Sequence, residues 1–276
     1  LFRLQEGGGQ GGTAACCISR LGGRVAYIGR LGDDKEGQFC LQRLKDFAVD
    51  TGDVEIIKAA QTPVAYIFVT RSTGARTILY ESSKLPRFEC TARMENLIAS
   101  TGVLLLDPET TYLAKELNRL KDSNTKVVYD CERWRDGLSD MMAVADYFIP
   151  CFEFLDTAEK GSGDRSLTEK MKGLKKKIRG ELIVTNGQEG AYFIEADRIY
   201  HVATPPVKAI DTIGAGDNFH ATFALAIARG MGLHQSVKLA VASASMSCRE
   251  YGGRKGIPSW NEAKTAARHL TAEVIQ

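Results

Sequence analysis

The sequence predicts an α/β protein with a three-layer α/β/α architecture, in which a mostly parallel sheet lies between two layers of helices. The first observation is that short runs rich in leucine and β-branched residues alternate with stretches of helical periodicity, which is typical of βαβ units. The second is that these runs are apolar throughout, as expected of strands covered on both faces. The runs are "RVAYIG" (24–29), "GVLLLD" (102–107), "KVVYD" (126–130), "DYFIP" (146–150) and "ELIVTNG" (181–187).

Two of the helices are predicted by apolar residues that recur at helical spacing, and we expect both to face the core. These residues are Cys40, Leu41, Leu44, Phe47 and Ala48 in the first helix, and Val237, Ala240, Val241, Ala244 and Cys248 in the second.

A hairpin interrupts this alternation. Residues 63–81 read as two strands of alternating character around the turn signal "STGA". Because such a hairpin lies outside a parallel sheet, we expect it to project as a small β lid. A second hairpin pattern, "GAYFIEADRIYHV" (190–202), is expected to form an antiparallel edge of the main sheet.

Length and composition limit the organisation and the partners. The chain has 276 residues, 44% of them hydrophobic, and no long linker, so we expect residues 1–276 to form a single domain. The formal net charge of +2 gives no reason to expect nucleic acid or a membrane as a partner. Seven cysteines without a CxxC pair favour an intracellular, cytoplasmic protein. Import into an organelle stays open, because the chain starts abruptly at Leu1.

The stretch "DTIGAGDNFHATF" (211–223) carries the most informative motif. Gly214, Ala215 and Gly216 allow a tight turn whose backbone N–H groups point into a common space, and a helix follows them up to Gly230. Such a helix N-terminus is an anion hole, with the Asp217 carboxylate beside it. The alternative is that Asp217 only caps the helix.

Two further glycine clusters are weaker signals when taken alone. "EGGGQGGTAACC" (6–17) opens a helix of small residues, and its loop lets a polyhydroxyl ligand approach the backbone closely. "LIVTNGQEGA" (182–191) fits a nucleotide that lies over the carboxyl end of a strand, or else a plain strand-turn-strand. The histidines at 201, 220, 234 and 269 show no metal spacing and are expected to be surface or packing residues.

Taken in this order, the three clusters resemble the PfkB, or ribokinase-like, family of carbohydrate kinases. The resemblance runs from the first glycine cluster through the 63–81 hairpin to "DTIGAGD" and "YGGRKGIP". It implies a ribokinase-like fold, a small sugar substrate, ATP with Mg²⁺, K⁺ in many members, and a homodimer through the lid. It also implies that Asp217 takes the proton of the substrate hydroxyl, and that the amides of Gly214, Ala215 and Gly216 stabilise the transferring phosphoryl group.

The resemblance carries over further site residues. They are Gly9, Gln10, Thr13 and Asp107 for the sugar, Thr185, Gly187, Gly190 and Gly252 for the nucleotide, and Asp211 for a monovalent cation.

The chain also departs from the family pattern. Thr13 stands where the family usually has Asn, and Cys151 and Phe154 replace both residues of an expected Asn-x-x-Glu element. Glu153 is therefore expected to act on Mg²⁺ indirectly, through its water shell. No first strand precedes the glycine loop, where the family carries a sugar-binding Asp.

Two classes of function follow. The intact Asp217 and anion hole favour an ATP-dependent kinase acting on a hydroxyl of a small sugar, with fructokinase, ribokinase, ketohexokinase-like and nucleoside kinase activities all open. The altered Asn-x-x-Glu element instead suggests a catalytically impaired binding or scaffold protein.

Overall fold

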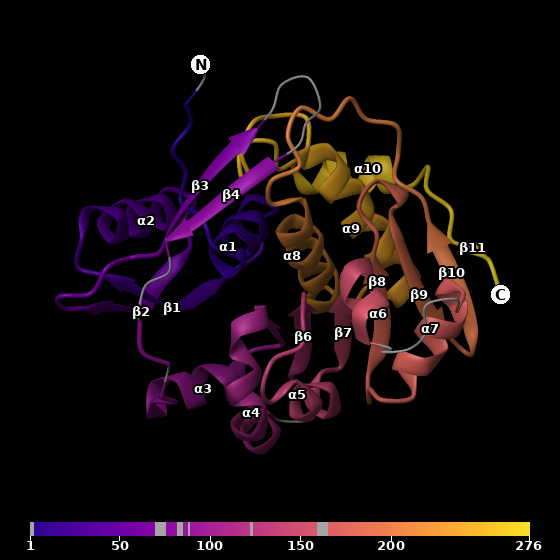
Figure 1. The fold of residues 1–276 in the computed structure, drawn as a ribbon, viewed down its shortest axis with the longest axis horizontal. Helices are drawn as coiled ribbons and strands as arrows, with labels where there is room; N and C mark the ends of the chain where they lie inside the picture. The colour runs from indigo at the N-terminus through magenta and orange to yellow at the C-terminus, as the bar shows by residue number, and fades with distance from the viewer. Residues whose placement is uncertain (1–2, 70–75, 82–84, 88, 122–123, 159–164) are drawn as a thin grey trace.

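The computed structural model describes residues 3–69, 76–81, 85–87, 89–121, 124–158 and 165–276 (Figure 1). A seven-stranded sheet in the order β11-β10-β9-β8-β7-β6-β5 organises the chain. Four strands are parallel: β5 (Val103–Leu106), β6 (Lys126–Cys131), β7 (Tyr147–Pro150) and β8 (Glu181–Thr185). The antiparallel strands β9 (Ala191–Glu195), β10 (Arg198–Val202) and β11 (Glu273–Val274) extend one edge. The predicted α/β class and the second hairpin are confirmed.

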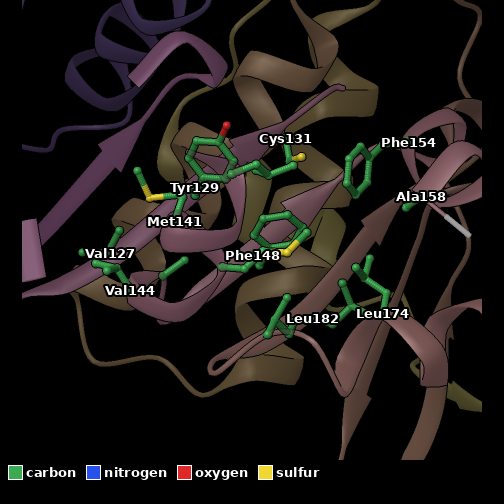
Figure 2. Packing of buried hydrophobic residues seen from close by; sticks show 14 of the residues in the cluster. Val127, Tyr129, Cys131, Met141, Val144, Phe148, Phe154, Ala158, Leu174 and Leu182 are labelled. Carbon is green, nitrogen blue, oxygen red and sulfur yellow. The ribbon is translucent and has the colours of Figure 1, made fainter. Parts of the chain in front are cut away.

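Helices cover both faces of this sheet, because its strands alternate apolar side chains between two cores. In β6, Val127 and Tyr129 point into one core while Val128 points into the other. The first core, shown in Figure 2, is closed by the helices of one layer. They are α3 (Ala92–Ser100), α4 (Ala114–Leu120), α5 (Leu138–Val144), α6 (Phe152–Ala158) and α7 (Leu167–Lys175).

The second core is closed by α8 (Ala215–Ala228) and α9 (Leu233–Ser247). Small side chains bring α1 (Gln10–Arg20) against α8, where Ala14 and Cys17 meet Ala221. On the other side, α10 (Trp260–Ala267) packs on α9. This packing fixes the start of α1 beside the start of α8, which is where the sequence places two of its glycine clusters.

The run at 24–29 does not join the central sheet, contrary to the expectation from its apolar residues. It forms most of β1 (Ala26–Gly32), which pairs in parallel only with β2 (Asp50–Ile57) in a separate two-stranded sheet and is connected to it by α2 (Lys35–Asp46). Both strands of this small sheet carry charged residues, Arg30 in β1 and Glu55 in β2, which fits a sheet that is not covered on both faces. Arg30 and Glu55 are register partners in this small sheet, and their side chains form an ion pair of 2.6 Å.

The predicted lid hairpin is present as a third, separate sheet of β3 (Val64–Val69) and β4 (Arg76–Glu81). In the view of Figure 1 this hairpin lies in front of α1, the helix that follows the first glycine cluster. Its predicted turn "STGA" lies outside the described residues. Seven of its large apolar side chains are exposed by 37% to 63%: Tyr66, Ile67, Phe68, Val69, Ile78, Leu79 and Tyr80.

The seven cysteines all lie in the described residues, and none of them is joined to another by a disulfide. Within the described part of the chain, no helix is both long and apolar enough to cross a bilayer.

Candidate active site

The start of α8 is the segment that the sequence predicts to hold an anion. Gly214 is the residue before the helix and has φ 73°, in the left-handed region that favours glycine. A Cβ at Gly214 would lie 2.8 Å from Gly253 Cα, whereas a Cβ at Gly216 would meet no atom within 4 Å. The amide of Ala215 donates to the Thr212 carbonyl at 3.3 Å. The first turn of α8 therefore pairs a tightly held N-cap with open space beside Gly216, at the end of a helix that favours negative charge.

Side chains tie the loop at 252–254 to both neighbouring segments. The backbone amide of Gly252 donates to Asp211 Oδ2 at 3.0 Å, and that of Gly253 donates to Glu6 Oε2 at 2.9 Å. On the other side, Asn218 Nδ2 donates to Gly253 O at 3.0 Å, and Arg254 Nη2 donates to the Gly8 carbonyl at 3.1 Å. The glycine loop before α1 and the start of α8 are thus joined through one segment.

Thr13 belongs to this support. It is only 5% exposed, and its methyl group lies 3.3 Å from the position of a Cβ at Gly214. This packing beneath the first turn of α8 explains why a small β-branched residue fits there. The sugar contact expected of Thr13 stays a prediction.

Asp217 is the third residue of α8, so it is not the N-cap that the capping interpretation required. Its side chain is half-buried. Burial raises its pKa well above the usual range of an aspartate, and the nearby Asp130 and Glu132 carboxylates raise it further, while Arg254 opposes them. A carboxylate whose pKa is raised is, once ionised, a better proton acceptor than an ordinary one.

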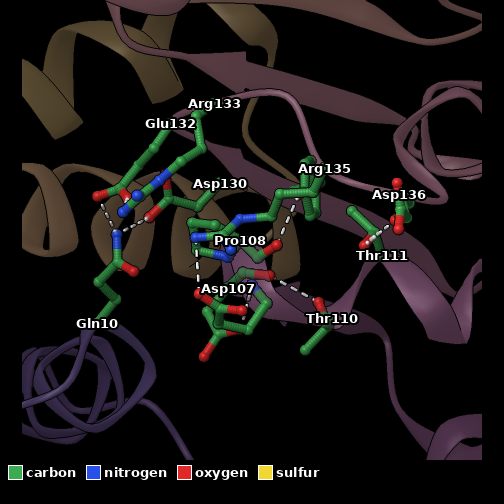
Figure 3. A network of polar contacts seen from close by, with 12 residues as sticks. Gln10, Asp107, Pro108, Thr110, Thr111, Asp130, Glu132, Arg133, Arg135 and Asp136 are labelled. Carbon is green, nitrogen blue, oxygen red and sulfur yellow. Dashed lines mark hydrogen bonds and ion pairs between the residues drawn. The ribbon is translucent and has the colours of Figure 1, made fainter. Parts of the chain in front are cut away.

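More carboxyl groups gather where the parallel strands end. Asp107 follows β5, and Asp130 and Glu132 lie at and just beyond the end of β6 (Figure 3). Gln10, the first residue of α1, donates from Nε2 to Glu132 Oε1 at 2.7 Å and to Asp130 Oδ2 at 3.4 Å. The carboxyl edge of the sheet, where ligands bind in open α/β folds, therefore meets the glycine loop.

Asp107 faces the same loop. Its Oδ2 atom lies 3.7 Å from the position of a Cβ at Gly11, and its Oδ1 atom accepts the Glu109 amide at 3.1 Å. Burial and the charge of Asp130 raise the pKa of Asp107 to about 6. The structure thus brings Asp107, Gln10 and the glycine loop together.

Asp130 and Glu132 are site residues that the sequence reasoning missed. Their signal was present, because "KVVYD" ends on an acid in the same way as "VLLLD", which led to Asp107. The carboxyl ends of parallel strands meet at one edge, so both acids were candidates for the same site.

The four nucleotide candidates lie in two places. Thr185 ends β8, and Gly187 (φ 49°) and Gly190 (φ 99°) follow it. A Cβ at Gly190 would lie 2.0 Å from the Val202 carbonyl oxygen, so this turn requires glycine. Gly252 (φ 85°) lies instead against Glu6 and Asp211. That these groups bind one nucleotide stays a prediction.

The structure explains one of the two replacements in the expected Asn-x-x-Glu element, that at Phe154. Phe154 is fully buried, with its ring centroid 6.1 Å from that of Phe148, so it completes the core. Glu153 is exposed in the first turn of α6. In the residues the structure describes, no three His, Cys, Asp or Glu side chains are grouped to hold a metal ion.

Asp211, the candidate for a monovalent cation, uses both carboxylate oxygens for backbone amides. Oδ1 accepts from Ile213 at 3.0 Å and Oδ2 accepts from Gly252 at 3.0 Å. These bonds hold two loops together, and the role of Asp211 toward K⁺ stays a prediction.

Known proteins are similar to this chain in sequence and in fold. The model of the pfkB family of carbohydrate kinases matches residues 4–260. Ribokinase from Lactococcus lactis is 27% identical over 273 residues, covering 95% of this chain and 86% of that protein. Ketohexokinase from Mus musculus is 24% identical, covering 90% and 86%. The structure of Arabidopsis thaliana ribokinase complexed with ribose and ATP superposes with a TM-score of 0.81 at 21% identity, covering 95% and 87%. With a family match over nearly its whole length, the chain belongs to the pfkB family of carbohydrate kinases.

Proposed function

We propose that this carbohydrate kinase transfers the γ-phosphoryl group of ATP to a hydroxyl of a small sugar, with Asp217 as the general base. The observation that carries the proposal is the first turn of α8, where the half-buried Asp217 follows an N-cap glycine and stands beside open space at Gly216. Both parts of the reaction, proton acceptance and phosphoryl stabilisation, are then supplied within four residues.

In the proposed step, the substrate hydroxyl gives its proton to the Asp217 carboxylate while its oxygen bonds to the γ-phosphorus. The bond from that phosphorus to the β,γ-bridging oxygen breaks, and ADP leaves. Phosphoryl transfer needs positioning and charge stabilisation more than a strong base. The amide of Gly216 and the dipole of the fourteen-residue helix α8 meet the charge on the transferred group, and the Ala215 amide joins them when it turns from the Thr212 carbonyl, to which it donates at 3.3 Å.

We assign the sugar to the space between the start of α1 and the carboxyl ends of β5 and β6. Gly9 (φ 81°) is the N-cap of α1, and no atom lies within 4 Å of the position of its Cβ, so a ligand can approach its backbone. Asp107 and Gln10 offer an acceptor and an amide for hydroxyl groups on the same side. Relatives named ribokinase, ketohexokinase and deoxyribokinase support a pentose or a ketohexose.

The nucleotide is assigned to the end of β8 and the loop at Gly252, with its terminal phosphate directed at the start of α8. Mg²⁺ fits this arrangement through water, because it keeps several waters and binds mainly phosphates and one or two carboxylates. Glu153, exposed where β7 ends, is the carboxylate we assign to that water shell. When bound, Mg²⁺ neutralises charge on the phosphates.

The lid hairpin is proposed to pair with a second copy of the chain. Seven exposed apolar side chains on two short strands form an unusual surface for an isolated hairpin, which is marginally stable in water. A dimer through β3 and β4 would cover them. Sedimentation as a monomer at every concentration would reject this assignment.

The function is tested by measuring ADP release from Mg²⁺-ATP with a panel of pentoses, ketohexoses and nucleosides. We expect turnover with at least one sugar and its loss when Mg²⁺ is chelated. ATP binding without ADP release for any compound would support the impaired scaffold instead.

A further inference from the structure

His220 lies one turn after Asp217 on α8 and is only 4% exposed. Its Nδ1 atom is 2.7 Å from the carbonyl oxygen of Gly216. Its Nε2 atom is 3.2 Å from the carbonyl oxygen of Ile149 and 3.4 Å from Asp130 Oδ1. Both ring nitrogens therefore face oxygen atoms, and the two carbonyl oxygens can only accept hydrogen bonds.

A neutral imidazole cannot satisfy this environment alone, because it has one N–H donor and one bare nitrogen. If Nδ1 carries the proton and donates to Gly216, a bare Nε2 would face the oxygens of Ile149 and Asp130. A second proton between Nε2 and Asp130 removes this conflict, whether it is held by the ring or by the carboxyl group. In both arrangements the His220–Asp130 pair has no net charge.

We propose that His220 is a positioning residue of the kinase, which neutralises Asp130 and thereby keeps the neighbouring Asp217 ionised and ready to accept the substrate proton. The inference rests on the proposed role of Asp217 as the base. It adds a residue to that site and explains how a base can function among several other carboxyl groups.

The charges around Asp217 support this role. Asp130 is the strongest of the like charges that raise the pKa of Asp217, after burial itself. His220 in turn lowers the pKa of Asp130 against the effect of its burial. Glu132 has its own partners, the neutral amide of Gln10 at 2.7 Å and the guanidinium of Arg133 at 3.7 Å. The titratable groups that face Asp217 are Asp130 and Glu132 from β6 and its end, Asp107 from the end of β5, Arg254 from the loop before α10, and Cys17 from α1.

The geometry also holds the ring in place. Nδ1 bonds the carbonyl of Gly216, four residues earlier on the same helix, and Nε2 is thereby directed across to the ends of β6 and β7. A helix that carries both the base and its compensating ring keeps the two in a fixed relation. His220 is thus more than the packing residue that the sequence suggested.

The test is the pH dependence of kcat/KM in the full-length kinase with its best sugar. His220→Asn keeps an N–H donor but cannot share the second proton. Asp130 then has no ring with which to share a proton, so its charge, once it ionises, repels Asp217 without compensation and makes Asp217 harder to ionise. The acid limb of the profile is expected to move to higher pH by about one unit, the lower end of what a nearby charge produces. The rate on the alkaline plateau should change much less.

Three variants make the result specific. Adding Asp130→Asn to His220→Asn removes the repelling charge and should return the limb toward its wild-type position. His234→Asn is the matched control, because Nε2 of His234 also contacts a carboxylate, Glu195 Oε2 at 2.7 Å, but from α9 at the antiparallel edge. Its limb should not move. An unmoved limb in folded His220→Asn overturns the proposal.

Two further measurements keep the outcome decisive. If His220→Asn fails to fold, His220→Gln is used, and the ¹⁵N shifts of the ring are recorded in the wild-type protein. A bare Nε2 that makes no hydrogen bond would overturn the proposal. Asp217→Asn is measured separately, since retained turnover there rejects the proposed base, whereas lost turnover with an unmoved His220→Asn limb rejects only this inference.

Discussion

Replacing Asp217 by Asn is expected to lower the activity of the enzyme but to raise its stability. Asn cannot accept the proton of the substrate hydroxyl, and general-base contributions are on the order of 10²–10⁴ in rate. We therefore expect kcat to fall by about that factor. Binding of ATP should be nearly unchanged, because the backbone amides of Ala215 and Gly216 remain in place.

The stability change follows from the raised pKa of Asp217. Its causes are burial and the like charges of Asp130 and Glu132, so ionising Asp217 is less favourable in the folded protein than in the unfolded chain. This destabilisation is absent below the ordinary pKa of aspartate and develops as the pH rises through the raised value. At pH 7 the Asn variant should therefore be more stable than the wild type and melt at a higher temperature. Near pH 4 the difference should disappear.

The assay is ADP release at saturating sugar, combined with melting curves of both proteins at pH 4 and pH 7. Turnover near the wild-type rate would remove Asp217 from the mechanism. Lost turnover with a Tm several degrees below wild type would instead show that the residue acts mainly in folding, and would refute the electrostatic argument.

Three other changes test separate parts of the site. Gly214→Ala should lower the free energy of unfolding by about 1–3 kcal/mol and also reduce kcat, because the φ of Gly214 is positive and a Cβ there would lie 2.8 Å from Gly253 Cα. Gly230→Ala is the control in melting curves: Gly230 also has a positive φ, 74°, but a Cβ there meets no atom, so its Tm change measures the cost of the backbone conformation alone. Asp107→Asn should raise KM for the sugar more than it lowers kcat, and an unchanged KM would exclude Asp107 from the sugar site. In the wild type, stability should fall as the pH rises from about 4 to the raised Asp107 pKa of about 6, and the Asn variant should not show this loss. Phe68→Ser, in the exposed hairpin, should favour the monomer in sedimentation without lowering Tm, and a dimer of unchanged affinity would place the interface elsewhere.

Much of the fold could be predicted because its signals are local. The strands β5 to β8 are apolar on both faces, and the turn from Gly214 to Asp217 is contiguous in sequence. The run at 24–29 was placed wrongly because its apolar residues resemble a central strand, while the charged residues of the small sheet lie beyond the run, at Arg30 in β1 and Glu55 in β2. A strand's own sequence does not reveal the composition of its neighbour.

The rest of the site depends on contacts between distant segments. Asp130 and His220 are far apart in sequence, and only the packing of α8 on the sheet brings the ring to the end of β6. The packing of Thr13 beneath Gly214 is a second example, because the turn of α1 that directs its side chain there is not visible in the glycine cluster. In both cases the direction of the side chain is set by tertiary packing.

The loop at 252–254 has a consequence for how the two substrates influence each other. It receives hydrogen bonds from, or gives them to, Glu6 and Gly8 on the sugar side and Asp211 and Asn218 on the phosphate side. A ligand that orders either side therefore orders part of the other, so the second ligand loses less conformational entropy when it binds. Such coupling is reciprocal: the factor by which a sugar tightens the binding of ATP must equal the factor by which ATP tightens the binding of the sugar.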